Sequence, residues 1–351
     1  TAGTIEIEFL QGKTNTGAIA SRTYAEAAGA RNWNVHPAFY YDGTSTTGTQ
    51  LSGIWVAKYD MSMETNGVVT ETSSASIGNV SVVDNTNIKA VSKPGLIAWR
   101  YIDVSNAFTN SLNYDTTSVS NANLDSHLMK RSEWGAVAYL AHSKYGRNAT
   151  AISNVNGYYT AGGSGATAHT NVLQSTTGNC YGIFDISGLG WDTLAAYCIG
   201  ATGSNGASLI NAASKYKDVY DAPDSTSDYS ERNDVRVYGD GIWETSSECY
   251  TNGSGTSNAG WYADNSYFVY SAKPFFYRGD YCDAGSSGTL AGAFAFSGDT
   301  GIPYVNLSWR VVLWGEKEKE EIKPADGSYY AAKGVNSPLL AEGMVAVYWD
   351  G

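Results

Sequence analysis

Apolar and polar positions alternate in two early stretches of the chain, and the alternation predicts strands there. Residues 1–10 read TAGTIEIEFL, and residues 51–62 read LSGIWVAKYDMS, which is rich in aromatic and β-branched residues. Residues 11–32 are polar and predict a loop. Residues 63–92 are rich in Ser, Thr, Asn and Val, which predicts a hairpin or a long loop.

Two later stretches predict helices. Residues 93–112 begin as extended chain, and Ser105 is expected to cap a short helix that carries Phe108 and Leu112. The clearest helical pattern lies in residues 125–146, with Ser132 as the expected cap and Gly146 as the expected end. Its apolar positions fall on one face, at Trp134, Val137, Ala138 and Ala141.

The second half of the chain is rich in turns. Residues 147–170 predict a Gly/Ser/Thr-rich loop, and residues 177–197 predict a compact strand–turn unit. Residues 200–260 are mostly irregular, with a strand expected near DVRVYGDGIWETS. From 261 to 314 aromatic residues alternate with small ones, and NLSWRVVLWG closes this part with the pattern of a central strand.

A change of composition near residue 315 predicts a boundary. The run EKEKEEIKPADG at 316–327 is densely charged and ends like a linker. We therefore expect one domain over residues 1–314, followed by a charged linker and a short C-terminal segment over 315–351.

Length and charge narrow the classes of function. The chain has 351 residues, of which 42% are apolar and 13% aromatic, which is enough for a large buried core. Its formal charge is −12, so nucleic acid and anionic membranes are poor partners. Because no apolar run reaches about 18–20 residues, no membrane insertion is expected.

Cysteine and histidine offer no obvious catalytic or zinc site. The cysteines lie far apart and form no CxxC pair, which argues against a zinc site. The sequence is compatible both with a Cys180–Cys198 disulfide and with buried free thiols. The four cysteines are Cys180, Cys198, Cys249 and Cys282, and the four histidines are His36, His127, His142 and His169. The histidines are scattered, so surface or packing roles are expected of them, and neither a GxSxG motif nor a P-loop is present.

Six short motifs, taken in order, resemble one family. They are GIWVAKYD (53–60), KPGLIAWR (93–100), MKRSEWGAVAYLAHSKYG (129–146), GNCYGIFDISGLGWD (178–192), FFYRGDYC (275–282) and LSWRVVL (307–313). Together they look like the motifs of formylglycine-generating-enzyme-type domains, a variant of the C-type lectin fold. The resemblance implies an α+β fold with short strands, two main helices and long irregular loops. It does not extend to residues 334–351.

Two of these stretches, EWGAVAYLAHSKYG and SYFVYSAKPFFYRG, resemble the variable proteins of diversity-generating retroelements more than the enzymes. In that subgroup, adenine-directed errors of reverse transcription rewrite a C-terminal patch that binds ligands. Asparagine codons mutated at adenine cannot yield Lys, Glu, Gln, Met or Trp. The stretch from Gly279 to Ser308 contains none of these five residues.

The resemblance implies a ligand-binding face in the C-terminal part of the domain. The expected contact residues are Tyr277, Asp280, Tyr281, Cys282, Asp283, Ala295, Ser297, Asp299, Thr300, Tyr304 and Asn306. In AGAFAF (291–296) and the residue after it, alternation predicts that Phe294 and Phe296 enter the core while Ala295 and Ser297 face the surface. Tyrosine suits such a face, since it offers a large rigid area with a polar tip.

The tripeptide Arg278-Gly279-Asp280 matches the motif that integrins read. The family has RGG at this place, which implies instead that Arg278 anchors a turn through hydrogen bonds to backbone carbonyls. Short matches of this kind arise by chance, so the anchoring role is the prediction.

The expected function is non-catalytic binding of a host-surface protein or a glycan receptor, by a phage tail or fibre protein or a bacterial surface protein. We expect the protein to be a homo-oligomer or part of a larger fibre assembly, because several copies would raise avidity. One alternative is a formylglycine-generating-type oxidase that acts on a protein cysteine, for which Cys249 and Cys282 lack the family's spacing. Another is a purely structural virion or pilus module. No cofactor is expected, although Asp185 and Asp192 suit either a structural Ca²⁺ or hydrogen-bonded turns.

Overall fold

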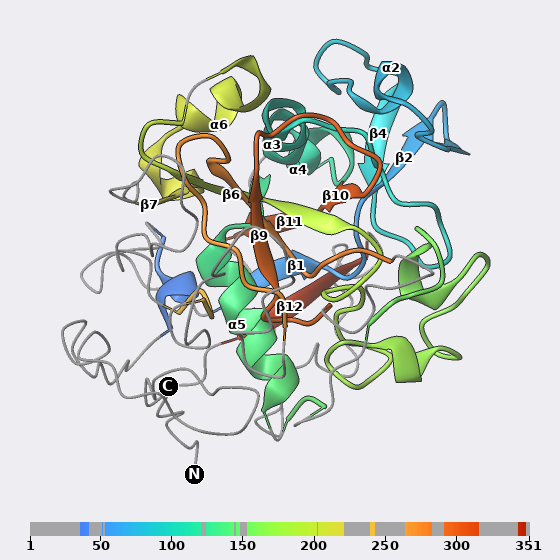
Figure 1. Ribbon diagram of the computed structural model, residues 1–351. Coiled ribbons are helices and arrows are strands. Elements are labelled where there is room, and N and C mark those ends of the chain that lie inside the picture. The colour runs from blue at the N-terminus through green and yellow to red at the C-terminus, as the bar shows by residue number, and fades with distance from the viewer. Residues whose placement is uncertain are drawn as a thin grey trace, which may run out of the picture.

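The computed structural model describes residues 36–41, 51, 53–120, 124–143, 145–147, 153–201, 203–220, 239–242, 264–282, 291–315 and 343–348. Within these ranges, helices combine with three β-sheets, as expected of an α+β protein (Figure 1). The strand expected over residues 1–10 lies outside the described ranges, and so does all but 239–242 of the strand expected near 234–246. In the same ranges, no helix has the length and apolar character that a membrane span needs.

The first sheet is antiparallel and has the strand order β12-β1-β11-β5. Its strands are β1 (Gly53–Ala57), β5 (Asp125–Leu128), β11 (Val311–Trp314) and β12 (Met344–Tyr348). The prediction of a strand within 51–62 is confirmed by β1. All five residues of β1 pair with β12. The boundary expected near residue 315 therefore does not separate residues 343–348 from the domain, because β12 completes its first sheet.

The second sheet has the order β10-β6-β8-β9, with β7 also paired to β6. Its strands are β6 (Trp191–Cys198), β7 (Asp218–Tyr220), β8 (Phe275–Arg278), β9 (Phe296–Asp299) and β10 (Leu307–Trp309). The closing pattern NLSWRVVLWG forms two strands, since β10 ends at Trp309 in this sheet and β11 begins at Val311 in the first. Arg310 is the link between the sheets.

The third sheet shows that residues 63–92 form a hairpin with an added strand. It contains β2 (Ser62–Thr65), β3 (Val68–Thr70) and β4 (Ile88–Val91) in the order β3-β2-β4. Asn66 and Gly67 connect β2 to β3 with φ angles of 53° and 79°. Two consecutive positive φ angles are typical of the two-residue turns that match the twist of a hairpin.

Both main helices begin before the predicted caps, and α5 ends earlier than predicted. Helix α3 (Val104–Leu112) is capped by Asp103, whose carboxylate accepts a hydrogen bond from the backbone N of Asn106 at 2.7 Å, so Ser105 is not the cap. Helix α5 (Arg131–His142) follows strand β5, and its first turn is closed by Glu133, which accepts from the backbone N of Lys130 at 2.9 Å. The expected cap Ser132 lies inside α5, and the helix ends before Gly146.

Several short helices complete the described chain. They are α2 (Ala75–Gly78), α4 (Tyr114–Thr117), α6 (Ala207–Ile210), η1 (Pro37–Phe39), η2 (Thr160–Gly162), η3 (Val172–Gln174), η4 (Ser204–Gly206) and η5 (Ser214–Tyr216). The described part of 147–170 is otherwise irregular, in agreement with the loop predicted there. In the unit predicted over 177–197, the strand β6 begins only at Trp191 and the residues before it form turns.

The first sheet is buried on both faces. Trp55 and Leu313 point into a core that contains Phe108 of α3. Ile54 and Val312 point the other way, into a core with the apolar face of α5. That face is the predicted one, with Trp134, Val137, Ala138 and Ala141 all buried. The first sheet is held between α3 and α5. The second sheet lies beside it and therefore has a rigid base (Figure 1).

Candidate ligand-binding face

Residues 300–306 form a surface segment whose backbone is fixed by hydrogen bonds. They follow β9 and run beside the chain that enters α3. Three bonds hold the segment: Val104 N to Gly301 O at 3.2 Å, Tyr101 N to Tyr304 O at 3.0 Å, and Trp191 N to Asn306 O at 2.7 Å. Because its carbonyls are paired inside the protein, the segment presents side chains rather than main chain to a partner.

Buried side chains support this segment from below. Trp191 of β6, Tyr277 of β8 and Leu307 of β10 form a small apolar cluster, and Tyr281 packs against its edge. Burial, together with the carboxylate of Asp299, raises the pKa of Tyr277 well above its ordinary value, so this phenol stays neutral. Tyr277 therefore belongs to the floor under the face and not to the face itself.

Six of the predicted contact residues are accessible. Tyr304 is 54% exposed, Thr300 is exposed, and Tyr281, Ser297, Asp299 and Asn306 are half-buried. Ser297 is the strand partner of Tyr277, so it stands on the same side of the second sheet as the supporting cluster. These residues and the segment 300–306 are called the C-terminal face below.

Four other predicted contact residues are buried, which corrects the prediction. Tyr277, Asp280, Cys282 and Ala295 have exposed fractions between 0 and 7%. Ala295 is buried because strand β9 begins only at Phe296, so strand alternation does not apply to it. Its N donates to Gly292 O at 3.0 Å and its carbonyl accepts from Gly279 N at 3.2 Å, which places it in a turn. Asp283 lies outside the described residues.

The Arg278-Gly279-Asp280 tripeptide is part of the protein interior. Arg278 is fully buried and donates to Asp240 O at 2.7 Å and to Ala293 O at 3.2 Å, so the predicted anchoring role is confirmed. Asp280 is 4% exposed and adopts a φ of 63°, with its carboxylate accepting from Tyr281 N at 2.8 Å. A receptor has no access to a tripeptide in this position, so integrin recognition is excluded for this conformation.

Sequence reasoning missed three residues beside the C-terminal face. The Arg100 guanidinium lies 4.0 Å from the centre of the Tyr158 ring and donates to Val305 O at 3.3 Å. Burial, followed by the nearby Cys282 and Tyr281, raises the pKa of the Tyr158 phenol. Tyr101 adopts a φ of 56°. A bulky residue in that region is strained, and such strain clusters at functional sites. The one sequence signal was Arg100 at the end of the KPGLIAWR motif, with Tyr101 directly after it.

The cysteines and histidines do not form a shared site within the described chain. Cys180, Cys198 and Cys282 are free thiols, so the Cys180–Cys198 pairing is wrong, and Cys249 lies outside the described residues. His36 is buried, and burial lowers its pKa to about 3. His127 is buried too, with Nε2 2.9 Å from Glu133 Oε1. Both are therefore packed residues, as expected.

Asp185 and Asp192 are held by hydrogen bonds from protein groups. Asp185 accepts from Ala161 N at 3.0 Å and from Asn154 Nδ2 at 3.0 Å. Asp192 accepts from the Ser308 hydroxyl at 3.1 Å. No group of three or more ligand residues suited to a metal ion occurs among the described residues. The geometry therefore matches the hydrogen-bonded role of both aspartates.

A buried charged network joins the two sheets at their junction. Arg310 is bonded to Asp60 and to Phe184 O, and its Nε lies 3.5 Å from Asp192 Oδ2. The Ser308 hydroxyl bonds to the Asp60 carboxylate at 2.6 Å. Desolvation raises the pKa of both aspartates, with that of Asp192 at about 6. All of these side chains are nearly inaccessible, so the network stabilises the junction and has no route to a ligand.

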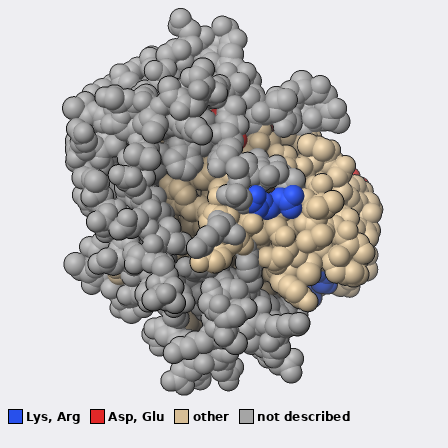
Figure 2. All heavy atoms as spheres, turned by 90° about the horizontal axis from the view of Figure 1, so that it is seen from below, with Lys and Arg blue, Asp and Glu red and all other residues tan. Residues whose placement is uncertain are grey.

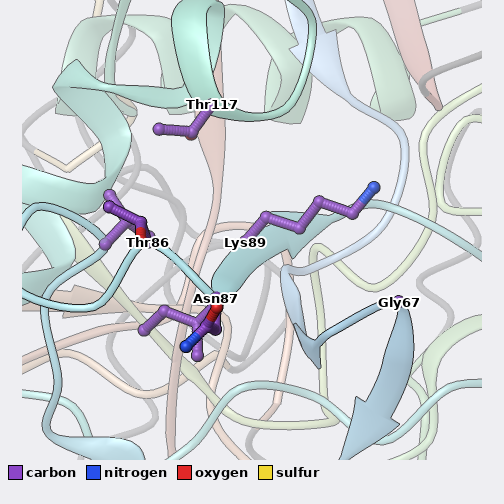
Figure 3. Close-up of a pocket in the computed structure, with 7 residues that line it drawn as sticks. Gly67, Thr86, Asn87, Lys89 and Thr117 are labelled. Atoms are coloured by element: carbon purple, nitrogen blue, oxygen red, sulfur yellow. The ribbon is translucent and has the colours of Figure 1, made fainter.

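A pocket of about 190 Å³ offers a second candidate site, between the third sheet and α4 (Figure 3). Thr86 and Asn87 line it from the loop before β4, and Thr117 lines it from α4. The amine of Lys89 extends away from these three residues and lies 3.5 Å from Glu64. The pocket thus lacks convergent free polar groups, and it is a weaker candidate than the C-terminal face.

Charge does not mark another binding surface among the described residues of the face that Figure 2 shows. On the face in Figure 2, the described residues carry few charged side chains.

In comparisons with known proteins, no family model matches this chain, and no curated protein matches it.

Proposed function

We propose that the protein is a non-catalytic binding protein of the C-type lectin fold, formylglycine-generating-enzyme type, and that its C-terminal face contacts the ligand. The observation that carries this proposal is the contrast along residues 297–306. Their backbone is fixed by internal hydrogen bonds, while the side chains of Thr300, Ile302 and Tyr304 are exposed. A rigid frame with free side chains loses little conformational entropy on binding.

The same contrast supports diversification of this face. Within the stretch that lacks Lys, Glu, Gln, Met and Trp, core positions such as Phe294 and Phe296 are fully buried. Accessible positions such as Ser297, Thr300 and Tyr304 could change without opening a cavity. We propose that variants differ at the accessible positions, and that display on a phage tail fibre or a bacterial surface raises avidity through several copies.

An array of host-surface proteins and glycans tests the binding function. The protein is expected to bind a defined subset, and Tyr304→Ala is expected to weaken that binding by about tenfold or more, since exposed tyrosines are frequent hot spots. Tyr181→Ala is the matched control, because Tyr181 is 61% exposed but belongs to a different loop. It should leave binding unchanged. Equal effects of the two substitutions, or no specific binding at all, would contradict the proposal.

A further inference from the structure

The guanidinium of Arg100 has hydrogen-bond donors that the surrounding protein satisfies weakly or not at all. It is 6% exposed, and its Nη1 donates to Val305 O at 3.3 Å. No described residue accepts a hydrogen bond from its buried Nε. Nη2 lies 3.8 Å from the carboxylate of Glu71, a distant ion pair with a side chain that is 62% exposed. The Tyr158 side chain also hydrogen-bonds to the guanidinium. Two weakly used N–H donors leave the guanidinium able to donate hydrogen bonds to a further anionic group.

The backbone holds Arg100 in place. Thr72 Oγ1 accepts a hydrogen bond from Arg100 N at 2.7 Å, and the Trp99 indole before it donates to Gly78 O at 2.8 Å in the core. The residue after it, Tyr101, is held in its left-handed conformation by the bond to Tyr304 O. Arg100 is therefore presented from a rigid base, which is what a pre-organised binding group requires.

Tyrosines surround the guanidinium. The rings of Tyr158 and Tyr101 have their centres 4.0 and 5.9 Å from the guanidinium carbon, and Tyr281 lies near Tyr158. Tyr304 is bonded to Tyr101 through the backbone and is 54% exposed. These residues connect Arg100 to the C-terminal face and offer flat surfaces with polar tips.

We propose that Arg100 binds the carboxylate of an acidic sugar, such as a uronic acid, and that the tyrosines contact the sugar ring. This inference rests on the proposed binding function and names the class of its ligand. A single negative charge fits better than a phosphate dianion, because the protein carries a net charge of −12 and Glu71 lies beside the site. A peptide strand fits less well, because the carbonyls of Gly301, Tyr304 and Asn306 already accept internal hydrogen bonds.

The bound carboxylate takes the place of Glu71 at Nη2. Glu71→Gln is therefore expected to strengthen binding of the acidic sugar by removing the competing charge. Arg100→Gln is expected to weaken it by at least about tenfold, the usual scale for a charge-assisted hydrogen bond. Arg100→Lys keeps the charge but loses the planar fork, so an intermediate loss is expected.

Titration of the full chain with sodium glucuronate, followed by NMR or calorimetry, tests the inference. Glucose, glucuronate methyl ester and acetate are the comparison probes, and glucuronate is expected to bind more tightly than each. Equal binding of glucose or the ester would overturn the role of the charge, and equal binding of acetate would overturn the role of the sugar ring. Absence of glucuronate binding would overturn the inference as a whole.

Failure of the acidic-sugar inference can be told apart from failure of the proposed binding function by two further results. If Arg100→Gln does not fold, Glu71→Gln still decides, because Glu71 is mostly exposed; unchanged or weaker glucuronate binding by that variant overturns the inference. If an array ligand is lost on Tyr304→Ala but retained on Arg100→Gln, the acidic-sugar inference fails while the binding function of the face stands.

Discussion

At the scale of single residues, neighbours in the sequence differ in role: one is buried and supports the fold, and another reaches the surface. Arg278 is fully buried and supports a turn, whereas Tyr281, three residues later, reaches the C-terminal face. The left-handed conformations of Gly279 and Asp280, with φ angles of 88° and 63°, turn the chain between them. This turn makes an apparent adhesion motif part of the structural support beneath the C-terminal face.

Substitution of Arg278 tests that structural role. Arg278→Met is expected to lower the free energy of unfolding by about 2–5 kcal/mol, because the buried carbonyls of Asp240 and Ala293 lose their donors. Arg278→Lys should cost less, since an ammonium group can still serve one carbonyl. Urea unfolding followed by tryptophan fluorescence measures both. A loss below about 1 kcal/mol for the Met variant would show that the hydrogen bonds contribute little.

At the scale of elements, strand β12 decides where the domain ends. It pairs with all of β1, and Met344, Val345 and Val347 are buried. A chain that ends after Gly315 would expose the edge of β1 and part of both cores. We expect this truncation to have a lower urea midpoint than the full chain and to aggregate more readily. An unchanged midpoint would mean that residues 343–348 are dispensable and that the boundary near 315 is a true domain limit.

The same elements show what the sequence can predict. Strand β1 and the apolar face of α5 followed from periodicity, because their patterns depend on local spacing and simple burial. The start of α3 did not, since Asp103 and Ser105 are both good caps. The Asp103 carboxylate caps the helix, whereas the Ser105 hydroxyl donates to Ser204 O, 99 positions away in the sequence.

The C-terminal face was predicted only in part, because tertiary contacts bring its members together. Its exposed members, such as Tyr304, lie in the expected stretch of chain. Arg100 joins it through a contact with Val305, a residue 205 positions away, and no local pattern encodes that contact. Ala295 was misplaced because a turn that closes on Gly292 delays the start of β9.

At the scale of the whole molecule, the protein buries an unusual number of acidic side chains. Asp185 and Asp264 are almost fully buried, and desolvation raises the pKa of each to about 7. Desolvation also raises the pKa of Asp192 to about 6. In the unfolded chain these groups return to their ordinary value of 3.8. Their combined titration should therefore make stability depend on pH between about pH 4 and pH 7.

The sign of this dependence follows from the protons held by each state. Between pH 4 and pH 7 the folded protein retains protons on these aspartates that the unfolded chain has released, so stability falls as the pH rises through that window. His36 opposes this trend up to about pH 6.5, because its folded pKa of about 3 leaves it neutral while the unfolded chain is protonated. The raised pKa of Asp60 acts in the same direction as those of Asp185, Asp192 and Asp264. These four acids outweigh His36, so stability is expected to fall from pH 5 to pH 7.5.

Asp185→Asn isolates one of these contributions. Asparagine tolerates the φ of 63° at this position, and its amide oxygen can accept from Ala161 N as the carboxylate does. Relative to the wild type, the variant should gain about 2 kcal/mol in free energy of unfolding between pH 5 and pH 7.5, since it has no proton to lose. Urea titrations at both pH values measure this difference. If the two proteins respond to pH in parallel, Asp185 is already ionised in the folded state, and its hydrogen bonds outweigh the cost of its burial.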